Sequence, residues 1–251
     1  MLSANQESQE NQYAFPYHHL VDYGDGIIQI NRLWAWAINY LGRIEIICQT
    51  LKTIEFSNLL DIGCGDGKLL GVLSSQYGDK VFTGIDYSSQ AIRLANSLCS
   101  SDCVGFREED IYKSNKADKF DVVTLIEVAE HIPPDNLHKF ICCVIEYMRP
   151  GGYLICTVPS INIPIPKKHY QHFSSQMMID VVAKAGLEVI HSEMIDGTSF
   201  FFRMLKRLFF NKLFYVSSSR LHNYLFSIYK RDCLWNQGKK GNGVFVIAKK
   251  P

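Results

Sequence analysis

LLDIGCGDGKLL, residues 59–70, is an apolar run that passes into three alternating glycines, Gly63, Gly65 and Gly67. Glycine loses more backbone entropy on folding than other residues, so such a cluster usually serves a tight turn or a ligand held close to the backbone. Asp86 ends the next strand-like run. A strand, a glycine-rich turn, a helix and an acid after the following strand are typical of a nucleotide-binding site, where the acid binds the ribose. The stretch therefore predicts a nucleotide-type cofactor.

The glycine spacing indicates which kind of cofactor to expect. A dinucleotide fingerprint reads G-x-G-x-x-G. Counted from Gly63, its third glycine would fall at position 68, which is Lys68, and the pattern here is D-x-G-x-G-x-G. The spacing therefore disfavours a nicotinamide-dependent oxidoreductase.

Length and composition describe a chain with one well-formed core and an appended element. Of its 251 residues, 47% are hydrophobic, which is enough to build such a core. The formal net charge is +1, so charge gives no reason to expect a nucleic-acid partner, and we expect no DNA binding. None of the eight cysteines forms a C-x-x-C pair or a zinc-like spacing. This cysteine usage is typical of a reducing compartment.

The N-terminal segment and the hydropathy pattern bear on localisation. Residues 1–12 are polar and contain no apolar core, so they predict a disordered tail rather than a secretory signal. No apolar run reaches the roughly 18 residues that a membrane span requires. We therefore expect a cytoplasmic protein, with peripheral attachment to a membrane as an alternative.

Strand-like and helix-like runs alternate after an N-terminal helix over residues 30–51. The alternation predicts an α/β protein, a Rossmann-like and mostly parallel sheet with helices on both faces. The strands are expected at 56–63, 80–86, 103–108, 120–127, 152–159, 187–195 and 243–250, and the helices at 67–77, 88–99, 135–148 and 174–186. We divide the chain into the tail 1–12, an N-terminal cap and helix over 13–54, a main domain over 55–197 with 243–251, and a helical insertion over 198–242.

The insertion is basic and aromatic. Residues 200–240 contain nine lysines and arginines against one acid, Asp232. On a helical wheel, one face gathers Phe201, Met204, Leu205, Leu208 and Phe209, and the opposite face carries Arg203, Lys206 and Arg207. The segment is interpreted as a lid over an acceptor pocket. Its alternatives are a membrane contact through residues 200–231 and, least favoured, an RNA-binding surface.

Five motifs in order resemble those of the class I S-adenosyl-L-methionine (SAM)-dependent methyltransferases. They are LLDIGCGDGKLL, GIDYS (84–88), EEDI (108–111), FDVVTLIEVAEHI (120–132) and MRPGGYLICTVP (148–159). The resemblance implies a seven-stranded sheet whose last strand is antiparallel. It also implies SAM as methyl donor, S-adenosyl-L-homocysteine as product, and direct displacement on the SAM methyl group.

The resemblance further assigns residues to the cofactor. The glycine turn would border the methionine part, Asp86 the ribose, Asp110 and the backbone of Ile111 the adenine, and the loop after the fourth strand the sulfonium. The residues assigned in this way are Asp61, Gly63, Cys64, Gly65, Asp86, Tyr87, Asp110, Ile111 and Glu127. Tyr87 is either an adenine-stacking ring or part of the core.

Two short blocks carry the candidates for catalysis, EVAEH (127–131) and KKHYQHFS (167–174). The E-x-x-E-H block is similar to that of the ubiquinone-pathway O-methyltransferases, which implies O-methylation of a small, amphiphilic or lipid-like acceptor. An oxygen nucleophile needs a base or a metal to lose its proton. We assign His131 and His172 as the catalytic base pair, and His169 with His131 to substrate binding.

Two other interpretations stay open. The blocks are more distantly similar to the metal-dependent RNA terminal-ribose methyltransferases, in which Glu127, Glu130, His131 and His172 would bind a divalent metal. That family continues with F-E-W, where this chain has Phe173-Ser174-Ser175. The chain could also be a non-catalytic binding module with the same fold.

Overall fold

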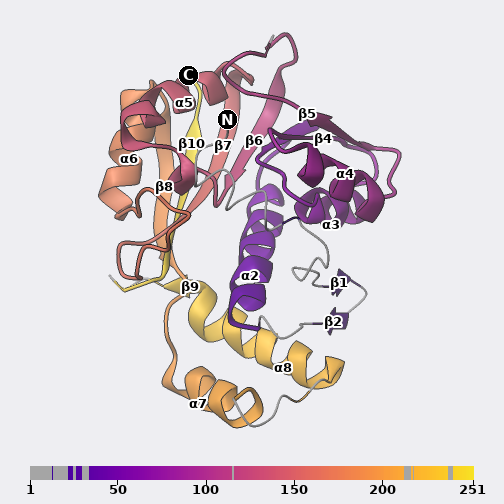
Figure 1. Cartoon of the computed structure of the whole chain (residues 1–251), viewed down its shortest axis with the longest axis vertical. Coiled ribbons are helices and arrows are strands. Elements are labelled where there is room, and N and C mark those ends of the chain that lie inside the picture. The colour runs from indigo at the N-terminus through magenta and orange to yellow at the C-terminus, as the bar shows by residue number, and fades with distance from the viewer. Residues whose placement is uncertain are drawn as a thin grey trace.

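The computed structural model describes residues 13, 22–24, 27–29, 34–114, 116–211, 216, 218–236 and 240–251. Its central sheet has the strand order β5-β4-β3-β6-β7-β10-β8-β9 (Figure 1). The strands of this sheet are β3 (Asn58–Ile62), β4 (Val81–Asp86), β5 (Val104–Glu108), β6 (Phe120–Ile126), β7 (Met148–Pro159), β8 (Glu188–Ile195), β9 (Trp235–Asn236) and β10 (Gly243–Lys249).

The strand directions confirm the predicted sheet. The pairs from β5 to β7 are parallel, and β10 runs antiparallel between β7 and β8. The seven expected strands all form. The two-residue strand β9, which the sequence did not indicate, adds an eighth at the outer edge through antiparallel pairing with β8.

Helices cover both faces of the sheet, as the alternating pattern predicts. Neighbouring strand residues point to opposite faces. Leu59 and Val122 belong to a core with α2, α3 and α8, whereas Leu60 and Val123 belong to a second core with α5 and α6. The helices are α2 (Trp34–Leu51), α3 (Lys68–Gln76), α4 (Ser89–Leu98), α5 (Pro134–Ile145), α6 (Ser175–Lys184), α7 (Phe200–Phe209) and α8 (Ser219–Tyr229).

Four of these helices begin at a serine that caps them. In each case the serine Oγ accepts a hydrogen bond from the backbone N–H three residues later, which satisfies a donor that the first helical turn leaves unpaired. The caps are Ser88, Ser174, Ser199 and Ser218, at the starts of α4, α6, α7 and α8.

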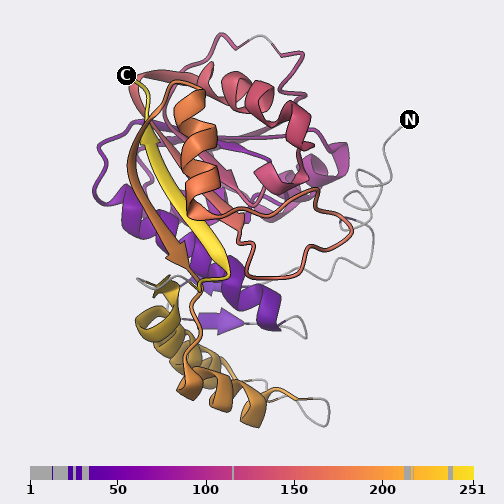
Figure 2. The ribbon, with the colours of Figure 1, turned by 90° about the vertical axis from the view of Figure 1, so that its left-hand side faces the viewer.

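The insertion helices extend beyond one end of the sheet, beside a small hairpin of β1 (Asp22–Gly24) and β2 (Ile27–Gln29) (Figures 1 and 2). α8 belongs to the core, since Leu225, Phe226 and Tyr229 are buried against α2. A π-helical turn, η3 (Lys230–Leu234), leads from α8 into β9. Residues 1–12 lie outside the described residues. No described helix combines the length and apolar character needed to cross a membrane.

α7 leaves most of its apolar face exposed. Its buried side chain is Phe202, whose ring lies 5.7 Å from that of Tyr229. Phe201, Met204 and Leu208 are exposed instead.

Candidate active site

The glycine turn after β3 adopts a backbone that favours glycine. The φ angles of Gly63, Gly65 and Gly67 are +74°, +55° and +75°, all in the left-handed region. A Cβ atom on Gly63 would lie 2.5 Å from Cγ2 of Val128, and one on Gly67 would lie 2.5 Å from the ring of Phe106. The turn is therefore confined between its neighbours at the edge where β3, β4 and β6 end, the usual position of a ligand in such sheets.

Asp86, the last residue of β4, is bound to this turn. Its Oδ2 accepts a hydrogen bond from the N–H of Gly65 (3.1 Å), and its Oδ1 accepts one from the N–H of Ser88 (2.9 Å). Asp86 therefore ties the end of β4 to the glycine turn.

Asp61 and Cys64 lie beside the turn and are buried. Thr124 Oγ1 donates a hydrogen bond to Asp61 Oδ1 at 2.6 Å. Burial raises the pKa of Asp61 to about 7 and raises the pKa of the Cys64 thiol above its ordinary value. The Cys64 sulfur packs against β4, since it lies 2.9 Å from the position that a Cβ on Gly84 would take.

The residues assigned to the adenine lie after β4 and β5. Tyr87 lies outside the core, with its ring exposed, and Ile111 is buried. Asp110 Oδ1 accepts a hydrogen bond from the N–H of Tyr112, and its Oδ2 pairs with Lys113 Nζ at 2.9 Å. The hydrogen bond from Lys113 lowers the pKa of Asp110. These cofactor assignments stay predictions.

Glu127 follows β6 in a left-handed backbone, with φ of +56°. Its N–H donates to the carbonyl of Thr157 at 2.9 Å, which ties the residue to β7. Its Oε1 accepts hydrogen bonds from Arg43 Nε and from Thr157 Oγ1, each at 3.0 Å. No helix starts at Glu127; only a 3₁₀ turn, η2 (Ala129–His131), follows.

The hydrogen bonds of the histidines define their tautomers. His131 Nδ1 lies 3.0 Å from the carbonyl of Lys168, and His172 Nδ1 lies 3.1 Å from the carbonyl of Ile163. Because a carbonyl only accepts, both Nδ1 atoms carry the proton. His172 Nε2 is then an acceptor, so the His169 Nδ1 at 2.9 Å donates to it. His131 and His169 both retain the lone pair on Nε2.

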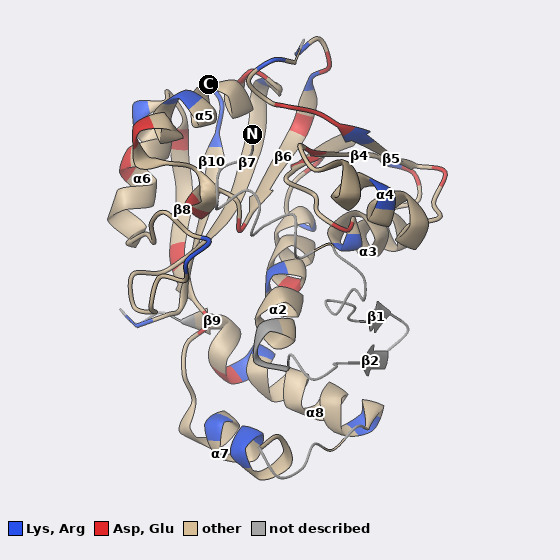
Figure 3. Ribbon diagram, in the orientation of Figure 1, with Lys and Arg blue, Asp and Glu red and all other residues tan. Residues whose placement is uncertain are grey.

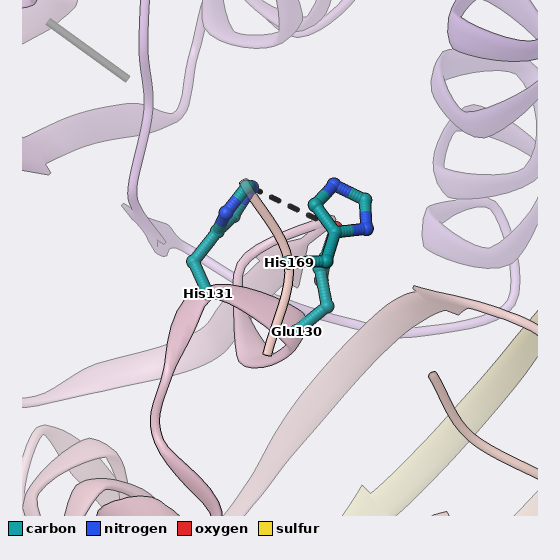
Figure 4. A group of neighbouring side chains, drawn as sticks. All are labelled: Glu130, His131 and His169. Atoms are coloured by element: carbon teal, nitrogen blue, oxygen red, sulfur yellow. Dashed lines mark ion pairs between the residues drawn. The ribbon is translucent and has the colours of Figure 1, made fainter. Parts of the chain in front are cut away.

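Glu130 lies beneath these two rings, which stand edge to face with their centroids 4.7 Å apart (Figure 4). Its side chain is 1% exposed, and its Oε1 lies 3.9 Å from His131 Nε2. Its Oε2 accepts no hydrogen bond from the described residues. Burial, and then the charge of Glu127, raise the pKa of Glu130. One carboxylate oxygen of Glu130 and one ring nitrogen each of His131 and His169 lie within 4.8 Å of one another.

The structure gives the two histidines of the second block different positions. His172 is 3% exposed, and both of its ring nitrogens are engaged, with Ile163 and His169. His169 is the ring that lies beside His131. His172 therefore orients His169, and the expected pairing of His131 with His172 does not occur as a direct contact. The predicted metal set is also divided, since Glu127 is bound to Arg43.

Several residues of the site escaped sequence reasoning. Arg43 is buried in α2 and reaches Glu127. Its signal was a single arginine within an otherwise apolar helical face. Lys168 is half-buried near Glu130, and burial lowers its pKa. The Tyr13 hydroxyl lies 3.3 Å from the position of a Cβ on Gly65, which places this ring over the glycine turn. The sequence offered no signal for Tyr13.

Comparison with known proteins identifies the family. A family described as "Methyltransferase domain" matches residues 29–192. The chain belongs to this family. Together with the sheet order and the glycine turn, the match makes the protein a class I SAM-dependent methyltransferase, and the predicted cofactor is confirmed.

Two relatives and one solved structure show how far the likeness extends. The ubiquinone biosynthesis O-methyltransferase of Alkalilimnicola ehrlichii is 32% identical over 124 residues, which cover 48% of this chain and 49% of that protein. The sphingolipid C9-methyltransferase of Komagataella phaffii is 29% identical over 122 residues, 44% of this chain and 25% of that protein. The chain thus spans about half the length of the first relative and a quarter of the second.

The solved structure is that of the N-methyltransferase NodS from Bradyrhizobium japonicum WM9 in complex with S-adenosyl-L-homocysteine. It superposes with a TM-score of 0.62 at 16% identity, over 99% of this chain and 100% of that chain. At this identity the likeness shows the fold. The observations that fit SAM to this chain are its own: the left-handed glycine turn at the end of β3, and Asp86 bound to it at the end of β4.

Proposed function

We propose that this methyltransferase transfers the methyl group of SAM to an oxygen atom of a small, amphiphilic acceptor. The observation that carries the proposal is the pair of Nε2 lone pairs on His131 and His169, whose rings stand together at the loop after β6. Burial lowers the pKa of His131 to about 4 and that of His169 to about 3. Both rings are therefore unprotonated at neutral pH, so each Nε2 can accept a hydrogen bond from the acceptor hydroxyl. Bases with so low a pKa take the proton only as the oxygen bonds to the methyl carbon, because that step makes the hydroxyl strongly acidic.

The chemistry is a direct displacement. The acceptor oxygen attacks the methyl carbon, the bond from carbon to sulfur breaks, and S-adenosyl-L-homocysteine leaves. The hydroxyl proton passes to Nε2 of His131 or His169, and His172 keeps the His169 lone pair directed at the acceptor. General-base assistance of this kind is worth about 10²–10⁴-fold in rate. Alignment of donor and nucleophile contributes about 7–11 kcal/mol to such reactions.

An amphiphilic acceptor is supported by the outer surface of α7. Phe200, Phe201, Met204 and Leu208 form its exposed apolar face, with Phe200 74% and Leu208 55% exposed. Arg203 and Arg207 are exposed beside this face, and Figure 3 shows the basic residues on the same helix. An apolar face flanked by arginines is suited to an anionic lipid surface. The two relatives, named for ubiquinone biosynthesis and sphingolipid methylation, support a lipid-like acceptor.

The test uses SAM labelled on its methyl group. The protein is incubated with cell extract, and the products are separated into lipid, small polar and RNA fractions. We expect label in the lipid fraction, on an oxygen atom. His131→Asn and His169→Asn should each lower the incorporation by about 10²-fold or more. His191→Asn, at an exposed position on β8, is the matched control. Label on nitrogen or carbon would overturn the proposal.

A second candidate, a metal-dependent methyltransferase of an RNA terminal ribose, is favoured by the cluster around Glu130. Two imidazole nitrogens and one carboxylate oxygen are a donor set that divalent transition metals accept, and the buried Oε2 of Glu130 has no partner among the described residues. Glu130, His131 and His169 would hold the ion, which would lower the pKa of an acceptor hydroxyl. Calorimetric titration with Mn²⁺ and label that enters RNA only without chelator would support this candidate.

A further inference from the structure

Arg43 is the centre of a buried ion network that joins distant parts of the chain. Its Nε donates to Glu127 Oε1 at 3.0 Å, and its Nη1 donates to Asp196 Oδ2. The other oxygen of Asp196 accepts a hydrogen bond from the Tyr229 hydroxyl. Burial alone would lower the pKa of Arg43, but the carboxylates of Asp196 and Glu127 raise it. The guanidinium therefore stays charged between the two acids.

Both acids of this network sit on unusual backbone. Glu127 has a φ of +56° and Asp196 a φ of +58°, and no other non-glycine residue of the described ranges has a positive φ. Such backbone costs free energy and persists only where the surroundings fix it, most often at functional positions. One guanidinium binds both side chains, so Arg43 is the shared support of the two strained residues.

Arg43 also packs closely against the sheet. A Cβ on Gly243, the first residue of β10, would lie 2.6 Å from Arg43 Nη2. The guanidinium is thus confined between the sheet and its two acids. A displacement of Asp196 would be transmitted to Arg43, because packed interiors have few alternative arrangements.

The members of the network come from different parts of the fold. Glu127 follows β6, at the cofactor edge of the sheet, and Asp196 directly follows β8. Tyr229 is the last residue of α8, in the insertion, and its ring packs against that of Phe202 in α7. The insertion therefore contacts the cofactor edge through side chains that are buried and charged or hydrogen-bonded.

We propose that Arg43, Asp196 and Tyr229 are positioning residues through which the insertion sets the orientation of Glu127, and with it the affinity for the cofactor. The inference rests on the proposed place of Glu127 beside the sulfonium. Without the Tyr229 hydroxyl, Asp196 satisfies both of its oxygens on Arg43. This draws the guanidinium away from Glu127 and leaves that carboxylate without its fixed direction.

The test is a double-mutant cycle read out by the affinity for S-adenosyl-L-homocysteine, measured by calorimetry, which requires no knowledge of the acceptor. Tyr229→Phe removes only the hydroxyl. Tyr224→Phe makes the same change at an exposed position of the same helix and is the matched control. We expect Tyr229→Phe and Glu127→Gln each to raise Kd by about threefold or more, the range of couplings in such networks. The double variant should bind no more weakly than Glu127→Gln alone.

A purely structural role of Tyr229 would give a different pattern. It would lower the melting temperature but leave Kd unchanged, or its effect on Kd would add to that of Glu127→Gln, and either result overturns the inference. If Glu127→Gln alone leaves Kd unchanged, the proposed place of Glu127 is wrong. The proposed role of Tyr229, which acts through Glu127, is then wrong as well. If Tyr229→Phe does not fold, Asp196→Asn takes its place in the cycle with Glu127→Gln, and the same Kd values are compared. None of these outcomes depends on whether the acceptor atom is oxygen.

Discussion

Gly42 and Tyr229 are in direct contact: a Cβ atom on Gly42 would lie 2.6 Å from the Tyr229 hydroxyl oxygen and 2.9 Å from its ring. α2 therefore carries a glycine at the point where the last turn of α8 crosses it. This close approach lets the Tyr229 hydroxyl reach Asp196. The position is occupied by glycine although glycine is a poor helix former.

The first prediction concerns this contact. Gly42→Ala should destabilise the protein by about 1–3 kcal/mol, because the added methyl group overpacks the crossing and outweighs the gain in helix propensity. Gly71→Ala is the control: Gly71 lies within α3, and its Cβ would meet the Cys99 sulfur at an ordinary 3.7 Å. That variant should gain about 0.5–1 kcal/mol. Chemical denaturation of both variants gives their free energies of unfolding. An increase for Gly42→Ala would contradict the proposed crowding.

A second prediction separates the roles of the two histidines in the 167–174 block. His169→Asn removes the ring beside His131, whereas His172→Asn removes only the acceptor that fixes the tautomer of His169. Turnover should fall by about 10²-fold or more in the first variant and by a smaller factor in the second. Affinity for S-adenosyl-L-homocysteine should change little in both. A larger loss of turnover in His172→Asn would show that His172 contacts the acceptor itself.

The third prediction is a pH dependence of stability that arises from Asp61. Its pKa is about 7 in the folded protein against an ordinary 3.8, so between these values the folded state binds a proton that the unfolded chain has released. The free energy of unfolding should therefore fall as pH rises across this window, by at most about 1.4 kcal/mol per pH unit. The groups that face this carboxyl are Thr124, Asp86 and Cys64.

Asp61→Asn isolates this contribution, since an amide oxygen still accepts the hydrogen bond from Thr124 and does not titrate. Denaturation curves of the two proteins between pH 5 and pH 8 should diverge as pH rises toward about 7. The variant should become the relatively more stable of the two, with a constant difference above that pH. Parallel curves across the range would mean that Asp61 has an ordinary pKa.

A fourth prediction addresses the exposed apolar face of α7. Leu208→Asp should abolish co-flotation with vesicles that contain anionic lipid, because it places a negative charge in the face that would enter the lipid headgroups. Ile190→Asp introduces the same change at another exposed apolar residue, on β8, and should float like the unaltered protein. Failure of the unaltered protein to float would leave α7 as a lid rather than a membrane contact.

The cofactor half of the site was predictable because its determinants are local. A strand, three glycines, a helix and Asp86 follow one another within about thirty residues, and the parallel sheet brings the strand ends together whatever the rest of the chain does. The approximate bounds of the elements followed from the alternation of strand-like and helix-like runs. No tertiary contact was needed for either inference.

The Arg43 network and the histidine cluster were not predictable in the same way. Arg43, Asp196 and Tyr229 come from three distant segments, and only the folded chain shows that they meet. The backbone of Glu127 is left-handed and a 3₁₀ turn follows it, so the E-x-x-E-H side chains do not lie along one face of an α-helix. Spacing placed His169 and His172 together. His172 is held by the carbonyl of Ile163, which leaves His169 as the ring that lies beside His131.

The insertion begins and ends at neighbouring points of the sheet. The N–H of Asn242 donates to the carbonyl of Asp196 at 3.1 Å, so the chain leaves the sheet after β8 and returns almost where it left. The entropy of closing such an excursion grows only slowly with its length. Changes of length within the excursion should therefore cost little stability, provided that they leave intact α8, which packs in the core against α2, and β9, which pairs with β8.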